Sequence, residues 1–203
     1  MAYFPFFADI EDRSVLIVGG GTVALRKAEK LLPYGPRISV LSPEHLPELE
    51  ALPVELIKGT FQESVLEGCD FVISATDDGE INSLVSKLCR EKHIPVNVVD
   101  DIEQCSFIFP SLIKKGKLSI GISTQGASPS TAVWLKEKIN SLLPEALPEI
   151  LDFLDESRPL VKESFVNGHE RAEVFKSLFE LCMLKGRAAT VPEAEEIIER
   201  YKK

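Results

Sequence analysis

Short apolar runs and helix-periodic segments alternate along the first half of the chain. Apolar runs of strand type are expected at residues 15–18, 38–41, 54–57, 71–75 and 96–99. Apolar residues recur with helical spacing over residues 24–32, and a second helix is expected over 79–93. Continuous apolar strands suit a sheet that is buried on both faces. Residues 1–113 are therefore expected to form a parallel α/β domain with crossover helices.

The pattern changes after this region. Strand-type runs at residues 107–109 and 118–122 are joined through a lysine-rich turn, and a helix is expected from Ser128 as N-cap and Pro129 to about residue 143. The rest is helical and charged, with a break near residues 166–168. We expect a small α+β dimerisation region at 114–144 and a helical domain at 145–203. Because one strand pair and one helix form only a small core, a homodimer is expected.

The link between the first strand and the first helix has the spacing G-x-G-x-x-A. Gly19 is expected to allow the tight turn, Gly21 the close approach of a pyrophosphate, and Ala24 the contact of helix and strand. The free N–H groups and positive end of the helix dipole would face the phosphates. This predicts a Rossmann-like dinucleotide site, the alternative being a tight turn that binds nothing. The cofactor-binding candidates in this turn are Gly19, Gly20, Gly21, Thr22 and Val23.

The ends of the second and fourth strands supply three more candidates for the cofactor site. Ser42 stands where such folds usually carry an acid for the adenosine ribose, and neither a carboxylate nor an arginine is there. The choice between NAD and NADP therefore stays open, and Ser42 also fits a turn before proline. Thr76 and Asp77 follow the fourth strand and are expected to line the crevice, whereas Asp78 is expected to cap the next helix.

Composition narrows the class of protein. The chain has 203 residues, 44% of them hydrophobic and 27% charged, with a formal net charge of −9. This acidity argues against nucleic acid or an anionic membrane as partner. No apolar run is long enough to span a bilayer, and the amino-terminal segment lacks the basic start of a signal peptide. A cytoplasmic protein is expected.

Metal chemistry has little support in the sequence. Four scattered cysteines form no C-x-x-C pair and are expected to be free thiols, and three isolated histidines are not expected to be ligands. No metal site is predicted.

Five motifs that follow one another in order along the chain are more specific to one family than the glycine turn alone. They are IVGGGTVALRKAEKLL, SATDD, VNVVDD, SFIFPSLIKKGKLSIGIST and ASPSTAVWLKEKI. Together they resemble the precorrin-2 dehydrogenase family, which includes stand-alone enzymes and the amino-terminal module of siroheme synthase. The resemblance extends from Phe4 to about Leu184. It implies NAD-dependent oxidation of precorrin-2, a partly reduced tetrapyrrole, to sirohydrochlorin. Some relatives also insert ferrous iron, and the sequence leaves that activity open.

The resemblance also implies which residues act. The aspartate that closes the VNVVD motif is Asp100, and a base is needed near the proton that the macrocycle loses. Asp100 could instead be a cap or turn residue, or act in a chelatase step. Its neighbour Asp101 is expected to point the other way.

Candidate substrate-binding residues lie further along the chain. The segment with Thr124 and Gly126 borders the substrate cleft in the family. Lys114 and Arg171 are candidates for the carboxylates of precorrin-2, since charge-assisted hydrogen bonds would favour basic side chains. A solvated hairpin turn explains Lys114 equally well.

Two other functions remain as alternatives. A non-catalytic nucleotide-sensing module would share the glycine motif but usually carries the ribose-binding acid that is absent here. A dehydrogenase for a small carbonyl compound would need a Tyr-x-x-x-Lys or His–Asp signature, which the chain lacks.

Overall fold

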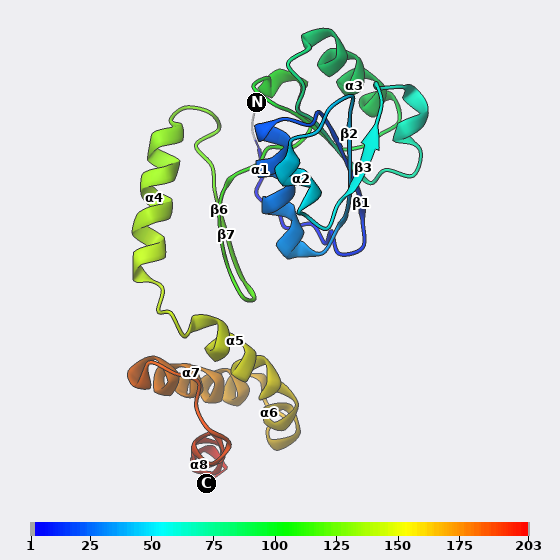
Figure 1. Cartoon of the computed structure of the whole chain (residues 1–203). Helices are drawn as coiled ribbons and strands as arrows, with labels where there is room; N and C mark the ends of the chain where they lie inside the picture. Colours follow the sequence, from blue (N-terminus) through cyan, green and yellow to red (C-terminus); the bar gives the residue numbers. More distant parts are fainter. Residues whose placement is uncertain (1–2, 203) are drawn as a thin grey trace. The chain divides into compact units, whose positions relative to one another are not determined.

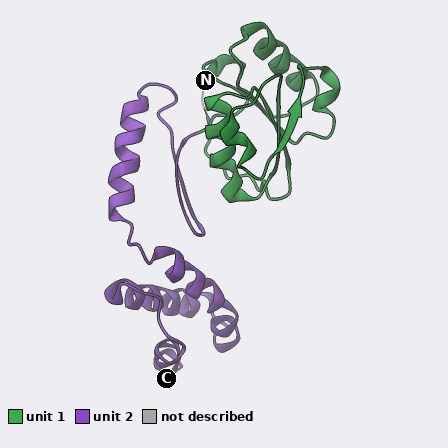
Figure 2. Ribbon diagram, viewed as in Figure 1, with its two compact units in different colours: residues 1–109 green, residues 110–203 purple. Residues whose placement is uncertain are grey.

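The computed structural model describes residues 3–202, which form two compact units (Figure 2). Unit 1 comprises residues 1–109 and unit 2 comprises residues 110–203. The division falls between Phe109 and Pro110, so both strands of the hairpin that follows belong to unit 2.

Unit 1 is a parallel sheet with helices on both faces. Its elements are β1 (Ser14–Val18), α1 (Thr22–Leu31), η1 (Leu32–Tyr34), β2 (Arg37–Ser42), α2 (Pro47–Glu50), β3 (Glu55–Lys58), η2 (Glu63–Leu66), β4 (Phe71–Ser74), α3 (Gly79–Glu91), β5 (Val96–Val98) and η3 (Ile102–Gln104) (Figure 1). The five expected strands and the two expected helices are confirmed, with ends that move by one or two residues.

The strand order is β3-β2-β1-β4-β5, and every neighbouring pair is parallel. The chain runs outward from β1 in one direction and then returns to place β4 on its other side. This reversal creates a switch point between β1 and β4, where ligands bind in open α/β sheets. The predicted Rossmann-like fold is therefore confirmed.

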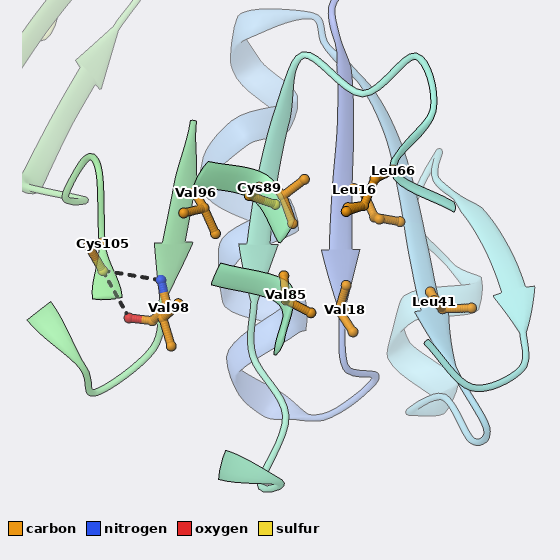
Figure 3. Close-up of a cluster of buried hydrophobic side chains, with 10 residues drawn as sticks. Leu16, Val18, Leu41, Leu66, Val85, Cys89, Val96, Val98 and Cys105 are labelled. Carbon is orange, nitrogen blue, oxygen red and sulfur yellow. Dashed lines mark hydrogen bonds between the residues drawn. The ribbon is translucent and has the colours of Figure 1, made fainter. Parts of the chain in front are cut away.

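Alternating side chains build a core on each face of the sheet. On one face Leu16, Val18 and Val98 pack with Val85 and Cys89 of α3 (Figure 3). On the other face, the side chains of β1, β2 and β4 pack against small residues of α1. The buried members of that second cluster are Val15, Ile17, Ala24, Ala28, Ile38, Val40, Leu49 and Ile73. Burial on both faces explains why these strands are continuous apolar runs.

Unit 2 begins with an antiparallel hairpin and continues as helices. Its elements are β6 (Ser111–Lys115), β7 (Leu118–Ile122), α4 (Pro129–Leu142), α5 (Leu147–Glu156), α6 (Arg158–Ser164), α7 (Gly168–Lys185) and α8 (Val191–Tyr201). Helix α4 packs on both strands, and the predicted cap is confirmed because Ser128 accepts a hydrogen bond from the Thr131 N–H. The predicted break at 166–168 is also confirmed, since Asn167 caps α7.

The expected strand at residues 107–109 is wrong. This segment has no ladder of its own, and the partner of β7 is Ser111–Lys115. The reason is packing. The ring of Phe107 lies edge-on to that of Phe71, with 6.0 Å between the ring centroids, and the centroids of the Phe107 and Phe109 rings are 5.6 Å apart. The apolar pattern therefore reports an aromatic cluster in unit 1. Among residues 3–202, each helix is too short or too polar to cross a membrane.

Candidate functional site

A glycine turn lies at the carboxyl end of β1, at the switch point of the sheet. Gly19 has a φ of 118°, and a Cβ there would come 2.2 Å from the Ala75 carbonyl oxygen. Its N–H donates to the Leu41 carbonyl at 2.8 Å, which fixes the turn between β2 and β4. Only glycine fits this position, because both the conformation and the space exclude a side chain.

The next two glycines differ in their surroundings. A Cβ on Gly20 would lie 2.2 Å from the Glu44 carbonyl oxygen, so the chain after β2 closes over this residue. A Cβ on Gly21 would meet no atom within 4 Å. A ligand could therefore approach the backbone closely at Gly21, whereas at Gly20 the chain after β2 already fills that space.

The start of α1 presents backbone donors next to that opening. Gly21 is the N-cap residue of α1, and no side chain accepts a hydrogen bond from the N–H groups that follow it. Thr22 and Val23 are the first helical residues. The first N–H groups of a helix have no partner within it, and they carry the positive end of the dipole. An uncapped helix start beside an open glycine fits a dinucleotide pyrophosphate.

Ser42 lies against the same turn. It is the last residue of β2, and its hydroxyl oxygen would be 2.9 Å from a Cβ placed on Gly20. Its carbonyl accepts the Gly59 N–H at 3.0 Å, so the side chain is held at the carboxyl edge of the sheet. The structure brings Ser42 together with the glycine turn.

The turn after β4 is organised by Asn82. Its amide oxygen accepts hydrogen bonds from Ser74 at 2.7 Å and Thr76 at 2.9 Å, and its amide nitrogen donates to the Thr76 carbonyl. The Thr76 hydroxyl hydrogen is thus directed within the turn, and toward a ligand this oxygen acts as an acceptor. Asp77 is exposed beside it, and Asp78 caps α3, as predicted, through the N–H groups of Glu80 and Ile81.

Asp100 follows β5 at the same edge of the sheet. It is exposed and has a φ of 61°, a left-handed conformation that aspartate adopts more readily than most residues. Its neighbour Asp101 has a different task. The Asp101 carboxylate accepts the N–H groups of Glu103 and Gln104 and so caps η3. The capping role that the sequence allowed for Asp100 belongs to Asp101.

Two polar residues near Asp100 were missed by the sequence interpretation. Lys27 of α1 donates to the amide oxygen of Asn97 in β5 at 3.1 Å, and its ammonium lies 3.9 Å from the centroid of the Phe109 ring. The pKa of Lys27 is lowered from its ordinary 10.5 to about 8, chiefly by burial and next by Lys30, while Cys105 and Asp100 oppose the shift. A signal was present, because Lys27 shares the buried stripe of Ala24 and Ala28.

Thr124 and Gly126 lie together in unit 2, in the loop between β7 and α4. The Thr124 hydroxyl donates to the Ser128 carbonyl at 3.1 Å and accepts the Ser128 N–H at 3.2 Å. Gln125 and Gly126 have φ values of 53° and 84°. The loop is therefore tightly turned, and the Thr124 hydroxyl holds it closed.

Lys114 and Arg171 lie elsewhere in unit 2. Lys114 is exposed in β6 and pairs in register with Ser119, near the hairpin turn, whereas Thr124 leaves the opposite end of the hairpin. Arg171 is half-buried in the first turn of α7. The structure does not bring Lys114 together with the Thr124 loop.

The side chains that could bind a metal ion are dispersed over the described part of the chain. Within residues 3–202, no three His, Cys, Asp or Glu side chains are grouped to hold a metal ion. The four cysteines are free thiols, as expected, and burial raises the pKa of each.

Comparison with known proteins agrees with this geometry. Residues 6–111 match the family described as "Putative NAD(P)-binding". The chain is 39% identical over 183 residues to the siroheme synthases of Citrobacter koseri and Escherichia coli O157:H7. The match covers 88% of this chain and 40% of each synthase, so the chain spans less than half the length of these relatives.

A solved structure matches the chain from end to end. It is "SirC, precorrin-2 dehydrogenase", with a TM-score of 0.74, 25% sequence identity, and coverage of 98% of this chain and 99% of that one. The glycine turn, the order of the strands and the match over residues 6–111 therefore show that the chain belongs to this NAD(P)-binding family.

Proposed function

We propose that the chain oxidises precorrin-2 to sirohydrochlorin with NAD, in siroheme or another tetrapyrrole pathway. The observation that carries the proposal is the end-to-end similarity to SirC, a precorrin-2 dehydrogenase. The 39% identity to siroheme synthases over 183 residues points to the same chemistry. The proposal rests on one further requirement, that unit 1 holds a dinucleotide.

Residues of unit 1 fit that requirement. Gly19 and Gly20 would hold the turn in its packed shape, Gly21 would let the pyrophosphate approach, and the N–H groups of Thr22 and Val23 would bind it. The Ser42 hydroxyl would face the adenosine ribose, while Thr76 and Asp77 would line the far side of the crevice. NAD is the proposed cofactor because the family resemblance implies it; the end of β2 carries neither a carboxylate for the ribose nor an arginine for a 2′-phosphate. Bound NAD supplies the acceptor for the hydride.

Asp100 is the proposed base. Oxidation of precorrin-2 removes a hydride and a proton from the macrocycle, and the proton must go to a group near the cofactor. Asp100 is an exposed carboxylate at the carboxyl end of β5, two strands from the glycine turn in the order β1-β4-β5. A carboxylate there is able to accept the proton while the hydride leaves.

Unit 2 is the proposed source of substrate contacts and of the dimer. Thr124 and Gly126 would border the substrate, and Lys114 and Arg171 would bind its carboxylates by charge-assisted hydrogen bonds. Residues 114–144 would form the homodimer, since Val133 and Trp134 of α4 are 50% and 55% exposed. Residues 145–203 would form the helical domain. The free thiols favour the cytoplasm as compartment.

The test is anaerobic incubation of the purified protein with precorrin-2 and NAD, followed by the visible spectrum and NADH formation. Sirohydrochlorin should appear only with protein and NAD, and NADP should be the poorer acceptor. Ferrous iron is added after this phase, so that metal insertion is measured separately. A mass of one chain in light scattering would contradict the dimer. Nucleotide binding without turnover would instead support a sensing module.

Asp100→Asn and Asp101→Asn form a matched pair for the base. Asp100→Asn should lower turnover by about a hundredfold or more and leave the NAD affinity unchanged. Asp101→Asn keeps an oxygen for the cap of η3 and should remain close to wild type. Equal turnover in the two variants would remove Asp100 from the mechanism.

A further inference from the structure

Lys27 is a charged residue in an apolar place. It lies on the face of α1 that also carries Ala24 and Ala28, both fully buried against the sheet. Its ammonium reaches past the helix to Asn97 of β5 and lies over the face of the Phe109 ring. Burying a charge is costly, so a lysine at this position calls for a role that an apolar side chain would not fill.

Asn97 connects Lys27 to the segment after β5. It is only 5% exposed and uses both ends of its amide. Its oxygen accepts from Lys27, and its nitrogen donates to the Cys105 sulfur at 3.3 Å and to the Phe107 carbonyl at 3.1 Å. A single side chain therefore ties α1 and β5 to residues 105–107.

The loop that carries Asp100 is closed at its base by the same contacts. Cys105 accepts the Val98 N–H at 3.1 Å, and its thiol lies 3.2 Å from the Val98 carbonyl oxygen (Figure 3). The thiol is also 3.2 Å from the Asp101 carbonyl oxygen. Residues 99–104 leave and return between these points, with Asp100 in the left-handed conformation. Since that conformation is sparsely populated by residues other than glycine, contacts at the base of the loop help to maintain it.

We infer that Lys27, acting through Asn97, is a positioning residue for Asp100, and that its ammonium is the counter-charge of the Asp100 carboxylate. The inference rests on the proposed dehydrogenation, in which Asp100 accepts a proton. Lys27 would not touch the reacting atoms. It would hold β5 and the Asp100 loop in place through a charge-assisted hydrogen bond, which is stronger than one between neutral groups.

The protonation state of Lys27 then limits activity at alkaline pH. The charged and titratable groups that act on it are Lys30 of the same helix, Cys105 after η3 and Asp100 after β5. Lys27 is charged below its pKa of about 8 and neutral above it. Turnover should therefore fall as the pH rises through about 8, whereas NAD binding at the glycine turn should not.

The variants Lys27→Met, Lys27→Arg and Lys30→Met test this inference with the anaerobic assay over pH 6.5 to about 9.5. Lys27→Met should lower kcat by about tenfold to a hundredfold, the size of effect that a misplaced group has, with the NAD dissociation constant unchanged. Lys27→Arg keeps a charge that does not titrate in this range and should move the alkaline fall upward. Lys30→Met removes a repelling neighbour and should keep kcat while moving the fall slightly upward.

Amide exchange of residues 99–104 provides a measurement that does not depend on activity. Exchange there should become faster in Lys27→Met and stay unchanged in Lys30→Met. If wild type turns over and Lys27→Met matches it in kcat, pH profile and exchange, the inference is overturned while the proposed function stands. An unshifted pH profile in Lys27→Arg also overturns it. An inactive wild type would overturn the proposed function and the inference together.

Discussion

The two units bury different kinds of side chain. Unit 1 buries Ser74 in β4, Asn97 in β5, and Asn82 and Ser86 in α3, the helix that follows β4. Among residues 110–202 the buried polar side chain is Ser157, the C-cap of α5, which donates to the Phe153 carbonyl one turn earlier. Buried polar groups need partners, so they are found where a structure has to fix loops in place.

Ion pairs lie on the surface in both units, as between Lys92 and Glu63 in unit 1. In unit 2 the ion pairs lie on the surface, such as Lys117 with Asp152 and Asp155, or Arg187 with Glu193. Unit 1 in addition places the charge of Lys27 against β5 and an aromatic ring. The comparison shows that unit 1 has a hydrogen-bonded polar network in its interior, whereas the ion pairs of unit 2 lie on its surface.

The largest change in stability is expected from a substitution in the glycine turn of unit 1. Gly19→Ala should destabilise unit 1 by about 3 kcal/mol, because the new Cβ meets the Ala75 carbonyl and the positive φ is unfavourable. Gly21→Ala is the matched control for stability, since nothing lies within 4 Å of its Cβ. It should stay within about 0.5 kcal/mol of wild type.

The two glycine variants separate folding from binding. Gly21→Ala should weaken NAD by about tenfold, as the methyl group takes space needed by the pyrophosphate, and Gly21→Asp should abolish binding. Calorimetric titration gives the affinity. Fluorescence of Trp134, the single tryptophan, reports unit 2 and should be unaffected. Full NAD affinity in Gly21→Asp would refute the proposed binding turn.

The burial of Lys27 predicts a pH dependence confined to unit 1. Its folded pKa of about 8 lies below the ordinary 10.5, so between these values the unfolded chain holds the proton and the folded chain does not. Wild type should therefore gain stability relative to Lys27→Met as the pH rises from about 7 to 10. After allowance for partial exposure, we expect about 1 to 2 kcal/mol. Denaturant titrations at both pH values measure this difference, and a difference of the opposite sign would contradict it.

Removing one helix cap from each unit tests whether the two units unfold independently. Asp78→Ala removes the cap of α3, and Ser128→Ala removes the cap of α4. Each should cost about 1 kcal/mol. Thermal melts followed by Trp134 fluorescence should respond to Ser128→Ala, whereas the NAD-dependent rise in melting temperature should respond to Asp78→Ala. Equal responses of both probes to both variants would show that the units unfold together.

The smallest expected effect concerns the surface of unit 2. Hydrogen bonds from Arg187, Lys185 and the Thr190 N–H hold the pKa of Glu193 well below its ordinary range. A depressed carboxylate pKa stabilises the fold above the unfolded value near 4.5 and loses that effect as the pH falls toward the folded pKa. Glu193→Gln should therefore lower the melting temperature slightly at pH 7 and have less effect at pH 3. Circular dichroism melts at both pH values test this.

The sequence by itself determined the fold class of unit 1 and the place of its glycine turn. Strand and helix periodicity are local patterns, and the spacing of Gly19, Gly21 and Ala24 occurs within one turn. The caps at Asp78 and Ser128 were predictable for the same reason, since a cap involves residues only two or three positions apart. The strand predicted at residues 107–109 was wrong because a strand and an aromatic cluster give the same local pattern of apolar residues.

The tertiary structure decided which distant side chains meet. Lys27 and Asn97 each interrupt an apolar pattern, but the sequence does not show that 70 positions of chain fold to place them 3.1 Å apart. The structure also showed that Asp101 caps η3 while Asp100 stays exposed, where the sequence predicted only that the two side chains point in opposite directions. Local pattern sets the elements, whereas contacts across the sheet set the polar network, because they depend on how strands and helices pack.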